Sequence, residues 1–456
     1  MNKYAISLFI ALLTAVCCLA QTRSFKRGVG YNTLMAEDVA ILSAGLTWGY
    51  NWGHSGSGNE SAFAACQVEF VPMAWSGIDK ERARNYYRAH PESKYILGFN
   101  EPNFNDQAHL TPVEAAAKWP DIEEIADEFN LTIVGPALNY SPNAPYQDPL
   151  KWYDEFFQAC SGCRVDHIAI HLYMPAMSAI KSNVERFQKY GKPIWLTEFC
   201  AWENNTTAAS QKRFLIETID YLEQEPAIFR YAWFKERGWN GGHPYMQLLD
   251  NRNEGVFTDL GAVYANMSSY DKNFYHPTET QIQSEHYIAM KGVNMEKTSD
   301  VSGLVNFCDF EPADYADYQI DIPETGEYVV SFRLCAEYPD DSEIKLSKDG
   351  QEFASLLFEK KGVGVWDTQS LKTTFQQGKQ TIRVGFKRGG LKLNWWSISK
   401  NEEVSILNTS TENQAIKLFK YYDLTGKPVN EDYKGFVIQK TVYEDGRVAN
   451  TKYFHQ

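Results

Sequence analysis

The sequence has too few basic residues to hold nucleic acid or an anionic membrane by charge. Its 44 Lys and Arg residues are outnumbered by 58 Asp and Glu residues, which leaves a formal net charge of −14 at pH 7. Proteins that bind a phosphate backbone need a clustered positive surface. We therefore expect no nucleic-acid partner, and a neutral ligand suits this composition better.

After the first twenty residues, the sequence has no apolar run long enough to cross a bilayer as a helix. The N-terminal segment has one early Lys3, an apolar run over residues 5–19, and the small residue Ala20. This order is typical of a secretory signal peptide, which is too short to span a membrane. We expect residues 1–20 to be removed and the protein to be secreted or held at the cell surface, with the periplasm as an alternative.

Cysteines are few, and the glycine-rich turn of dinucleotide-binding folds is absent. Six of the eight cysteines follow the signal peptide, and Cys160 and Cys163 have no second C-x-x-C pair with which to build a zinc site. Export permits disulfides. Cys160 and Cys163 either close a small loop or stay buried thiols like the other four, and we prefer the thiols. No Gly-x-Gly-x-x-Gly motif occurs. We expect neither a metal nor a cofactor.

The chain is long and rich in aromatic residues. At 456 residues it exceeds one compact core of usual size, so two or three domains are expected. Its 12 Trp, 27 Tyr and 26 Phe residues make up 14% of the chain. Most of these rings will fill a core, but flat rings with polar edges also stack on sugars.

From Arg27 to about Arg237, short apolar runs alternate with amphipathic helical patterns such as "DKERARNYYRAH" and "SAIKSNVERFQKYG". Eight runs have the length and composition of buried strands, and they begin near residues 27, 46, 68, 95, 131, 165, 193 and 229. Eight strand–helix units predict a (β/α)8 TIM barrel, within residues 24–270. An open doubly wound sheet is the structural alternative.

Polar and aromatic residues gather where the predicted strands end, which is where a barrel carries its active site. Asn100 and Glu101 follow the fourth strand, and Glu198 ends the seventh. Cleavage of a glycosidic bond needs one carboxyl group to protonate the leaving oxygen and another to act as nucleophile or base. We expect Glu101 to be the protonated acid/base, Glu198 the ionised nucleophile, and the Asn100 amide a partner of a substrate hydroxyl. The alternative for each carboxylate is a solvated strand end.

Other strand-end residues are candidates for substrate binding. A His beside an apolar strand is often structural, and a Trp at a strand end can belong to the core instead of the site. The candidates are Trp48, Trp52, Trp75, His171, Tyr173, Trp202 and Trp233.

After residue 270 the pattern changes to short strands separated by turn signals such as "PETGEY" and "SKDGQE". We predict a linker over residues 271–282 and an all-β sandwich over 283–400. A polar segment and further strand–turn–strand patterns predict a small C-terminal β module over 401–456. The predicted fold is thus an α/β barrel followed by two β regions.

Six motifs, in order along the barrel, resemble those of glycoside hydrolase family 128, the endo-β-1,3-glucanases with an Asl1-like catalytic domain. They are "TWGYNWG", "FVPMAW", "LGFNEPN", "VGPAL", "HIAIHLY" and "PIWLTEF". The resemblance implies a retaining hydrolase of β-1,3-glucan, with Glu101 as acid/base after Asn100 and with Glu198 as nucleophile. Another β-glycan as substrate, or a non-catalytic glycan-binding protein, is the alternative.

The two β regions carry resemblances of their own. Residues 283–400 are similar to carbohydrate-binding modules of family 6, through "SEHYIAMKG", "DYADYQIDIPETGEYVVSFRLCA", "GVGVWDTQS" and "GLKLNWWSI". This implies that Trp366 and Asn394 hold a sugar, although Val363 stands where a Trp is frequent; a purely structural sandwich is the alternative. "YYDLTGKPVN", "KGFVIQK" and "YEDGRV" resemble a Bacteroidetes-type C-terminal sorting domain, which implies a place at or beyond the outer surface.

Overall fold

A computed structural model describes residues 21–238, 245–338, 341–401, 416–422, 427–430, 433–443 and 448–455. They belong to two compact units, Met1–Asn401 and Glu402–Gln456. The predicted signal peptide lies outside the described residues. Within those ranges, no helix combines the length and the apolar character needed to cross a bilayer.

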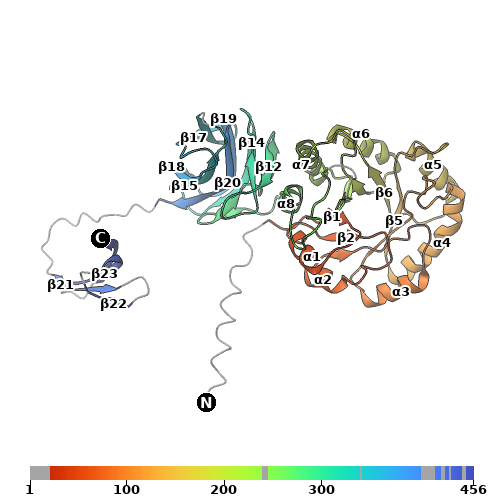
Figure 1. The fold of residues 1–456 in the computed structure, drawn as a ribbon, viewed down its shortest axis with the longest axis horizontal. Coiled ribbons are helices and arrows are strands. Elements are labelled where there is room, and N and C mark those ends of the chain that lie inside the picture. Colours follow the sequence, from red (N-terminus) through yellow and green to blue (C-terminus); the bar gives the residue numbers. More distant parts are fainter. Residues whose placement is uncertain are drawn as a thin grey trace, which may run out of the picture. The chain divides into compact units, whose positions relative to one another are not determined.

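The first unit begins with eight parallel strands that close into a barrel (Figure 1). Strand β1 pairs with both β2 and β8, and a bridge between Met73 and Leu97 joins the chain after β3 to β4. The predicted (β/α)8 barrel is therefore confirmed. The strands are β1 (Arg27–Gly30), β2 (Trp48–Tyr50), β3 (Glu69–Phe70), β4 (Tyr95–Leu97), β5 (Thr132–Leu138), β6 (His167–Leu172), β7 (Ile194–Phe199) and β8 (Ile228–Phe234).

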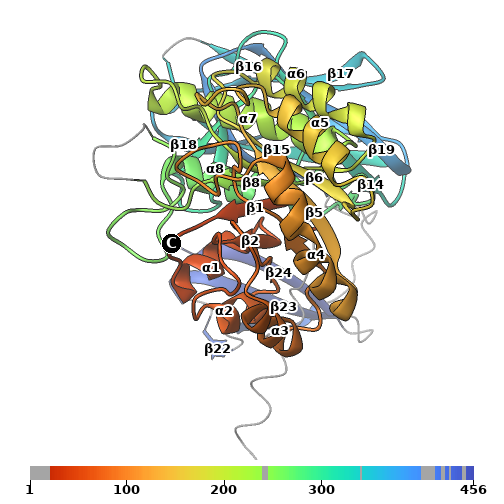
Figure 2. The same cartoon turned by 90° about the vertical axis from the view of Figure 1, so that its right-hand side faces the viewer.

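Helices surround this barrel, and Figures 1 and 2 show α3, α4 and α5 following one another around its outside. Local sequence sets their ends: α4 starts with a capping box in which Thr111 and Glu114 bond each other's backbone N–H groups. The helices are α1 (Ala36–Leu42), α2 (Glu60–Ala65), α3 (Lys80–Ala89), α4 (Pro112–Phe129), α5 (Pro149–Ala159), α6 (Met177–Phe187), α7 (Ala208–Gln224) and α8 (Asp259–Asn266), with a short 3-10 helix at Gln188–Tyr190.

The chain after α5 is closed by a disulfide between Cys160 and Cys163. Our preference for six free thiols is therefore wrong for this pair, whose spacing of three residues suits a small loop. Cys66, Cys200, Cys308 and Cys335 are free.

Side-chain alternation along the strands separates the barrel interior from the layer beneath the helices. Because alternate residues of a strand share a face, Trp48 and Tyr50 of β2 point the same way. Trp48 and Tyr50 pack with Trp195 inside the barrel, and Trp52 continues this column to the end where the strands finish. The interior is thus a packed core that supports the residues at its mouth.

Residues 276–400 form the predicted β-sandwich, which is confirmed (Figure 1). One sheet runs β12 (Asn294–Lys297), β13 (Val305–Cys308), β20 (Leu391–Lys400), β15 (Gly326–Ala336) and β18 (Trp366–Phe375), with β10 (Gln281–Gln283) beside β20. The other runs β11 (Ala289–Lys291), β14 (Tyr315–Ile322), β19 (Gly378–Arg388), β16 (Ser342–Lys348) and β17 (Gln351–Phe358), with β9 (His276–Pro277) beside β14. Two pieces of the expected linker thus pair as strands.

The barrel and the sandwich pack directly on each other within the first unit. Tyr270 is buried, its ring lies 5.4 Å from that of Tyr287 in the sandwich, and its hydroxyl bonds Asp220 of α7. The backbone N–H of Lys297 in β12 donates to Asp259 of α8 at 2.6 Å. These contacts hold the sandwich against α7 and α8.

The second unit contains the predicted small β module as a four-stranded antiparallel sheet. Its order is β22 (Pro428–Val429), β21 (Ile416–Tyr422), β23 (Gly435–Tyr443) and β24 (Val448–His455).

Candidate active site

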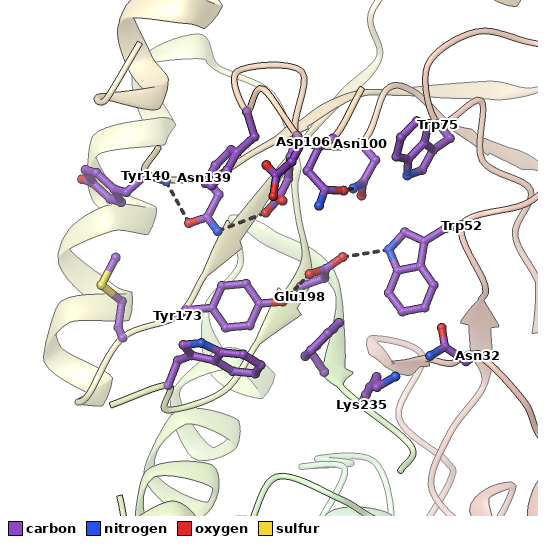
Figure 3. Close-up of a pocket in the computed structure, with 16 residues that line it drawn as sticks. Asn32, Trp52, Trp75, Asn100, Asp106, Asn139, Tyr140, Tyr173, Glu198 and Lys235 are labelled. Carbon is purple, nitrogen blue, oxygen red and sulfur yellow. Dashed lines mark hydrogen bonds between the residues drawn. The ribbon is translucent and has the colours of Figure 1, made fainter. Parts of the chain in front are cut away.

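A pocket of about 680 Å³ opens where the barrel strands end (Figure 3). Its wall has seven aromatic rings, four amides, three carboxylates and one ammonium group, a mixture that suits a ligand with many hydroxyl groups. The lining residues are Asn32, Trp52, Trp75, Asn100, Glu101, Phe104, Asp106, Gln107, Asn139, Tyr140, Tyr173, Met174, Glu198, Trp202, Phe234 and Lys235.

Glu198, near the end of β7, is surrounded by hydrogen-bond donors. Its Oε1 accepts from Trp52 Nε1 at 2.8 Å and from the Tyr50 hydroxyl at 3.2 Å. Its Oε2 accepts from the Tyr173 hydroxyl and lies 3.4 Å from His171 Nδ1. Figure 3 shows the carboxylate between Tyr173 and Trp52. Donors on both oxygens hold the carboxylate in one orientation and favour its charged form.

Burial acts against these donors. It raises the pKa of the Glu198 carboxyl, and the nearby Glu101 carboxylate raises it further, while His171, Tyr173 and Trp52 pull it down; the net direction is upward. Burial alone lowers the pKa of His171, but attraction to Glu198 and the hydrogen bond to Glu101 outweigh it and raise that pKa. The pKa values of Glu198 and His171 therefore each depend on the charge of the other group.

Glu101 follows β4 and is held differently. Its Oε1 accepts from Asn139 Nδ2 at 3.0 Å and lies 2.9 Å from His171 Nδ1. Its backbone N–H donates to the carbonyl of Ala137 in β5 at 2.8 Å. Ligand atoms of Glu101, His171 and Glu198 all lie within 4.8 Å of one another. The sequence expectation that the two carboxylates meet across the mouth agrees with this geometry.

Two residues of the pocket have an unusual backbone. Glu101 has a φ of 43° and Trp52 a φ of 61°, both in the left-handed region that residues other than glycine rarely adopt. Such conformations persist where the surrounding structure imposes them, and they concentrate at functional sites.

The pocket collects most of the predicted site residues. Besides Glu101 and Glu198, the predicted side chains of Trp52, Trp75, Asn100, Tyr173 and Trp202 line it. Asn100 donates from Nδ2 to Gln107 Oε1 at 3.2 Å, while its buried Oδ1 has no partner among the described residues. His171 lies beneath the wall, fully buried, and touches both carboxylates.

Trp48 and Trp233 do not contact a ligand in the pocket, which corrects two of our predictions. Both are fully buried. Trp48 begins β2 and donates to the carbonyl of Lys26, at the opposite end of the barrel. Trp233 points outward from β8 against Tyr264 of α8, and its neighbour Phe234 faces the pocket instead.

The sequence prediction missed several lining residues. Asn139 follows β5, the strand whose end was assigned no candidate, so the strand-end rule applied to "VGPALN" would have found it. Asn32 follows β1 and Lys235 follows β8 in the same way. Phe104, Asp106 and Gln107 lie in the loop after β4, and Tyr140 and Met174 also come from loops; a pattern of strands carries no signal for them.

In the sandwich, the predicted glycan contact of Asn394 is wrong. This residue is fully buried, and its Nδ2 donates to Asp300 Oδ2 at 2.7 Å and to the Ser302 carbonyl at 2.8 Å. Arg333 holds Asp300 through two bonds, of 2.7 and 2.8 Å, so this loop covers the amide. Trp366 is half-buried and donates to Ser299 Oγ at 3.1 Å.

Among the described residues, Glu101, His171 and Glu198 form a group whose side chains could hold a cation. However, its geometry suits proton sharing better. His171 Nδ1 is within hydrogen-bond distance of Glu101 Oε1, and a ring nitrogen that donates a proton there has no lone pair left for a metal.

Comparisons with known proteins match two regions of the chain. A family model described as "Glycosyl hydrolase catalytic core" covers residues 28–264, and one described as "Carbohydrate binding module (family 6)" covers 283–400. Among solved structures, a GH128 (subgroup II) endo-beta-1,3-glucanase from Pseudomonas viridiflava is 35% identical, with a TM-score of 0.50; the match covers 54% of this chain and 98% of that one.

Two curated proteins are also similar over part of the chain. Alkali-sensitive linkage protein 1 of Schizosaccharomyces pombe is 27% identical over 256 residues, 53% of this chain and 44% of that protein. Clotting factor G alpha subunit of Tachypleus tridentatus is 29% identical over 151 residues, 31% of this chain and 22% of that protein. The matched region thus spans less than half of either relative.

Proposed function

Because the chain belongs to the glycosyl hydrolase catalytic core family, we propose that it cleaves β-1,3-glucan with retention of configuration, by double displacement. One observation carries the mechanism: both carboxyl groups line the pocket, and one oxygen of Glu101 lies within 4.8 Å of one oxygen of Glu198. Carboxyl groups of retaining glycosidases are about 5–5.5 Å apart, whereas inverting enzymes need about 6.5–9.5 Å to admit a water. The Pseudomonas viridiflava glucanase supports the linkage and endo action.

In the first step, an oxygen of Glu198 bonds to the anomeric carbon while Glu101 gives its proton to the departing glycosidic oxygen. The bond between the anomeric carbon and that oxygen breaks, and its electron pair takes the proton. The donors Trp52, Tyr50 and Tyr173 keep the attacking carboxylate in place before the reaction.

In the second step, Glu101, now a carboxylate, removes a proton from water as the water oxygen attacks the same carbon. The ester bond to Glu198 breaks, and its electrons return to that carboxylate. Two inversions give net retention. His171 contacts both carboxyl groups, so it can stabilise the negative charge as it passes from one to the other.

The aromatic wall supports a sugar substrate. Trp52, Trp75, Trp202 and Phe234 line the pocket, and their ring faces can stack on pyranose rings. Asn100 lines the same pocket beside Glu101, where its amide group can form a hydrogen bond with a substrate hydroxyl.

We expect the purified protein to release reducing ends from laminarin and to leave a linear β-1,4-glucan intact. Product sizing that shows a ladder of oligosaccharides would support endo action, and proton NMR of the first products should show β-anomers before mutarotation. Binding of laminarin without any release of reducing ends would contradict the proposal and favour a glycan-binding protein.

Replacing Tyr173 with Phe is expected to move the acid limb of the kcat/KM profile to higher pH. Wild-type activity falls as the pH drops through the raised pKa of the nucleophile Glu198. The variant removes a donor that favours the charged form, so the pKa rises further, by about one unit. The measurement is the pH dependence of laminarin hydrolysis.

The matched control for this measurement is Tyr140→Phe. The Tyr140 hydroxyl also belongs to a pocket tyrosine, but it bonds Asn183 at 2.6 Å and neither carboxylate. The acid limb should stay in place in this variant. If the acid limb of Tyr173→Phe stays where it is in the wild type, the tyrosine does not lower the pKa of Glu198.

The remaining parts of the chain support further proposals about where the enzyme works. We propose that residues 1–20 direct export, that 24–270 form the catalytic domain, and that 401–456 act as a sorting module that leaves the enzyme secreted or at the cell surface. The carbohydrate-binding-module match over 283–400 supports glycan capture by the sandwich, at a surface other than the covered Asn394.

A further inference from the structure

Asn139, just after β5, makes a hydrogen bond whose direction is determined by its surroundings. Its Oδ1 accepts the backbone N–H of Tyr140 at 2.8 Å, so its Nδ2 group must be the end that faces Glu101 Oε1, at 3.0 Å. Its backbone carbonyl accepts from Asn103 Nδ2 at 2.7 Å. The amide is therefore a fixed donor to Glu101.

The two oxygens of the Glu101 carboxyl group have different surroundings. Oε1 receives Asn139 Nδ2 and lies 2.9 Å from His171 Nδ1. Oε2 has no hydrogen bond from the part of the chain that the structure describes, and it is not among the buried unpartnered atoms there. Since Glu101 lines the pocket, Oε2 is the oxygen that faces the pocket.

A neutral carboxyl group has one oxygen that only accepts and one that carries the proton. When Nδ1 of His171 carries the ring proton, Oε1 receives two N–H groups and has no room for a proton of its own. The proton of Glu101 therefore belongs on Oε2, where a leaving oxygen can reach it. After the proton leaves, both N–H groups still stabilise the negative charge on Oε1.

We propose that Asn139 is a positioning residue which, together with His171, confines the transferable proton of Glu101 to its pocket-facing oxygen. The inference rests on the proposed function, because it assigns Glu101 the acid/base role. Asn139 does not give or take a proton itself; it acts through the orientation and the charge of Glu101.

The test compares Asn139→Ala and Asn139→Asp with wild type on two substrates. Laminarin needs a protonated acid, whereas a dinitrophenyl β-laminaribioside has a leaving group that departs without one. Asn139→Ala should lower kcat on laminarin by about 10- to 100-fold, as expected for losing a hydrogen bond to a charged group. Its first-step rate on the aryl substrate should stay within about threefold of wild type, because acid catalysis is not used there.

The pH profile gives a second readout. Asn139→Asp places another carboxylate beside Glu101. The added negative charge opposes loss of the Glu101 proton, so the alkaline limb of the profile on laminarin should move to higher pH, by about one unit or more. Asn85→Asp is the matched control, because this exposed residue lies on α3 outside the pocket and adds the same charge. Its limb should not move.

The outcomes separate the inference from the function on which it rests. Equal losses of Asn139→Ala on both substrates, with an unmoved limb in Asn139→Asp, would overturn the positioning role and leave a structural one. A wild-type enzyme inactive on laminarin would instead overturn the proposed function. In that case, carbon NMR titration of the Glu101 carboxyl group still tests the inference, since its midpoint must move in Asn139→Asp; an unchanged midpoint would overturn it.

Discussion

Glu198→Gln is expected to lower kcat on laminarin by about 10⁴- to 10⁶-fold, the size of loss seen when a nucleophile is removed. The amide has nearly the same shape as the carboxylate, so it keeps its place between Trp52 and Tyr173. A neutral amide is too weak a nucleophile to form the covalent bond to the anomeric carbon. Affinity for laminarin, measured by titration calorimetry, should change little, because the substitution leaves the aromatic residues that line the pocket intact.

A second variant tests from which face of the sugar ring Glu198 attacks the anomeric carbon. In Glu198→Ala, azide can enter the vacated space and attack an activated aryl glycoside, which gives an α-glycosyl azide by a single inversion. The matched control is Glu203→Gln in the exposed loop after β7, which should retain wild-type turnover. Wild-type-like hydrolysis by Glu198→Gln, or a β-azide from Glu198→Ala, would contradict the nucleophile assignment.

The barrel and its two carboxylates could be predicted from sequence because they depend on order along the chain. Eight buried runs determine eight strands, and every parallel strand of a barrel ends on the same face. Glu101 and Glu198 therefore had to approach the same mouth. This prediction required only the order of the strands, and no knowledge of which distant side chains contact each other.

The direction of individual side chains could not be predicted in the same way. Strands of a parallel barrel are buried on both faces, so they lack the apolar–polar alternation that reveals the orientation of a strand. Trp233 and Phe234 are consecutive residues of β8 and face opposite sides of the strand. Trp233 lies beneath the helices, and Phe234 lines the pocket. Trp48 begins β2 and lies in the core, whereas Trp52 comes two residues after β2 ends and lines the pocket.

The roles of the two carboxylates depend on contacts that no local pattern encodes. Glu198 has donors on both oxygens, as suits a carboxylate that must be charged. In the part of the chain that the structure describes, the side-chain contacts of the Glu101 carboxyl group all reach Oε1. Asn139 and His171 come from strands that are far from Glu101 in sequence. The sequence left His171 between a structural and an orienting role, and the structure gives it a place in both.

Glu101→Ala is expected to lower kcat on laminarin by about 10²- to 10⁴-fold, the usual contribution of general acid catalysis. The loss should nearly vanish for the first step of a dinitrophenyl β-laminaribioside, since this leaving group needs no proton. The second step lacks its base, so the covalent enzyme should accumulate, visible as a burst of dinitrophenolate and as a mass increase of one disaccharide unit.

Azide then gives the opposite stereochemistry from that of the Glu198 variant. In Glu101→Ala it attacks the covalent intermediate without help from a base, and two inversions yield a β-glycosyl azide with restored turnover. The alkaline limb of the kcat/KM profile on laminarin should also disappear from the residual activity, because the group whose proton was required is gone. An α-azide from Glu101→Ala would reverse the two roles. Equal losses on laminarin and the aryl substrate would mean that Glu101 supports the site without transferring the proton.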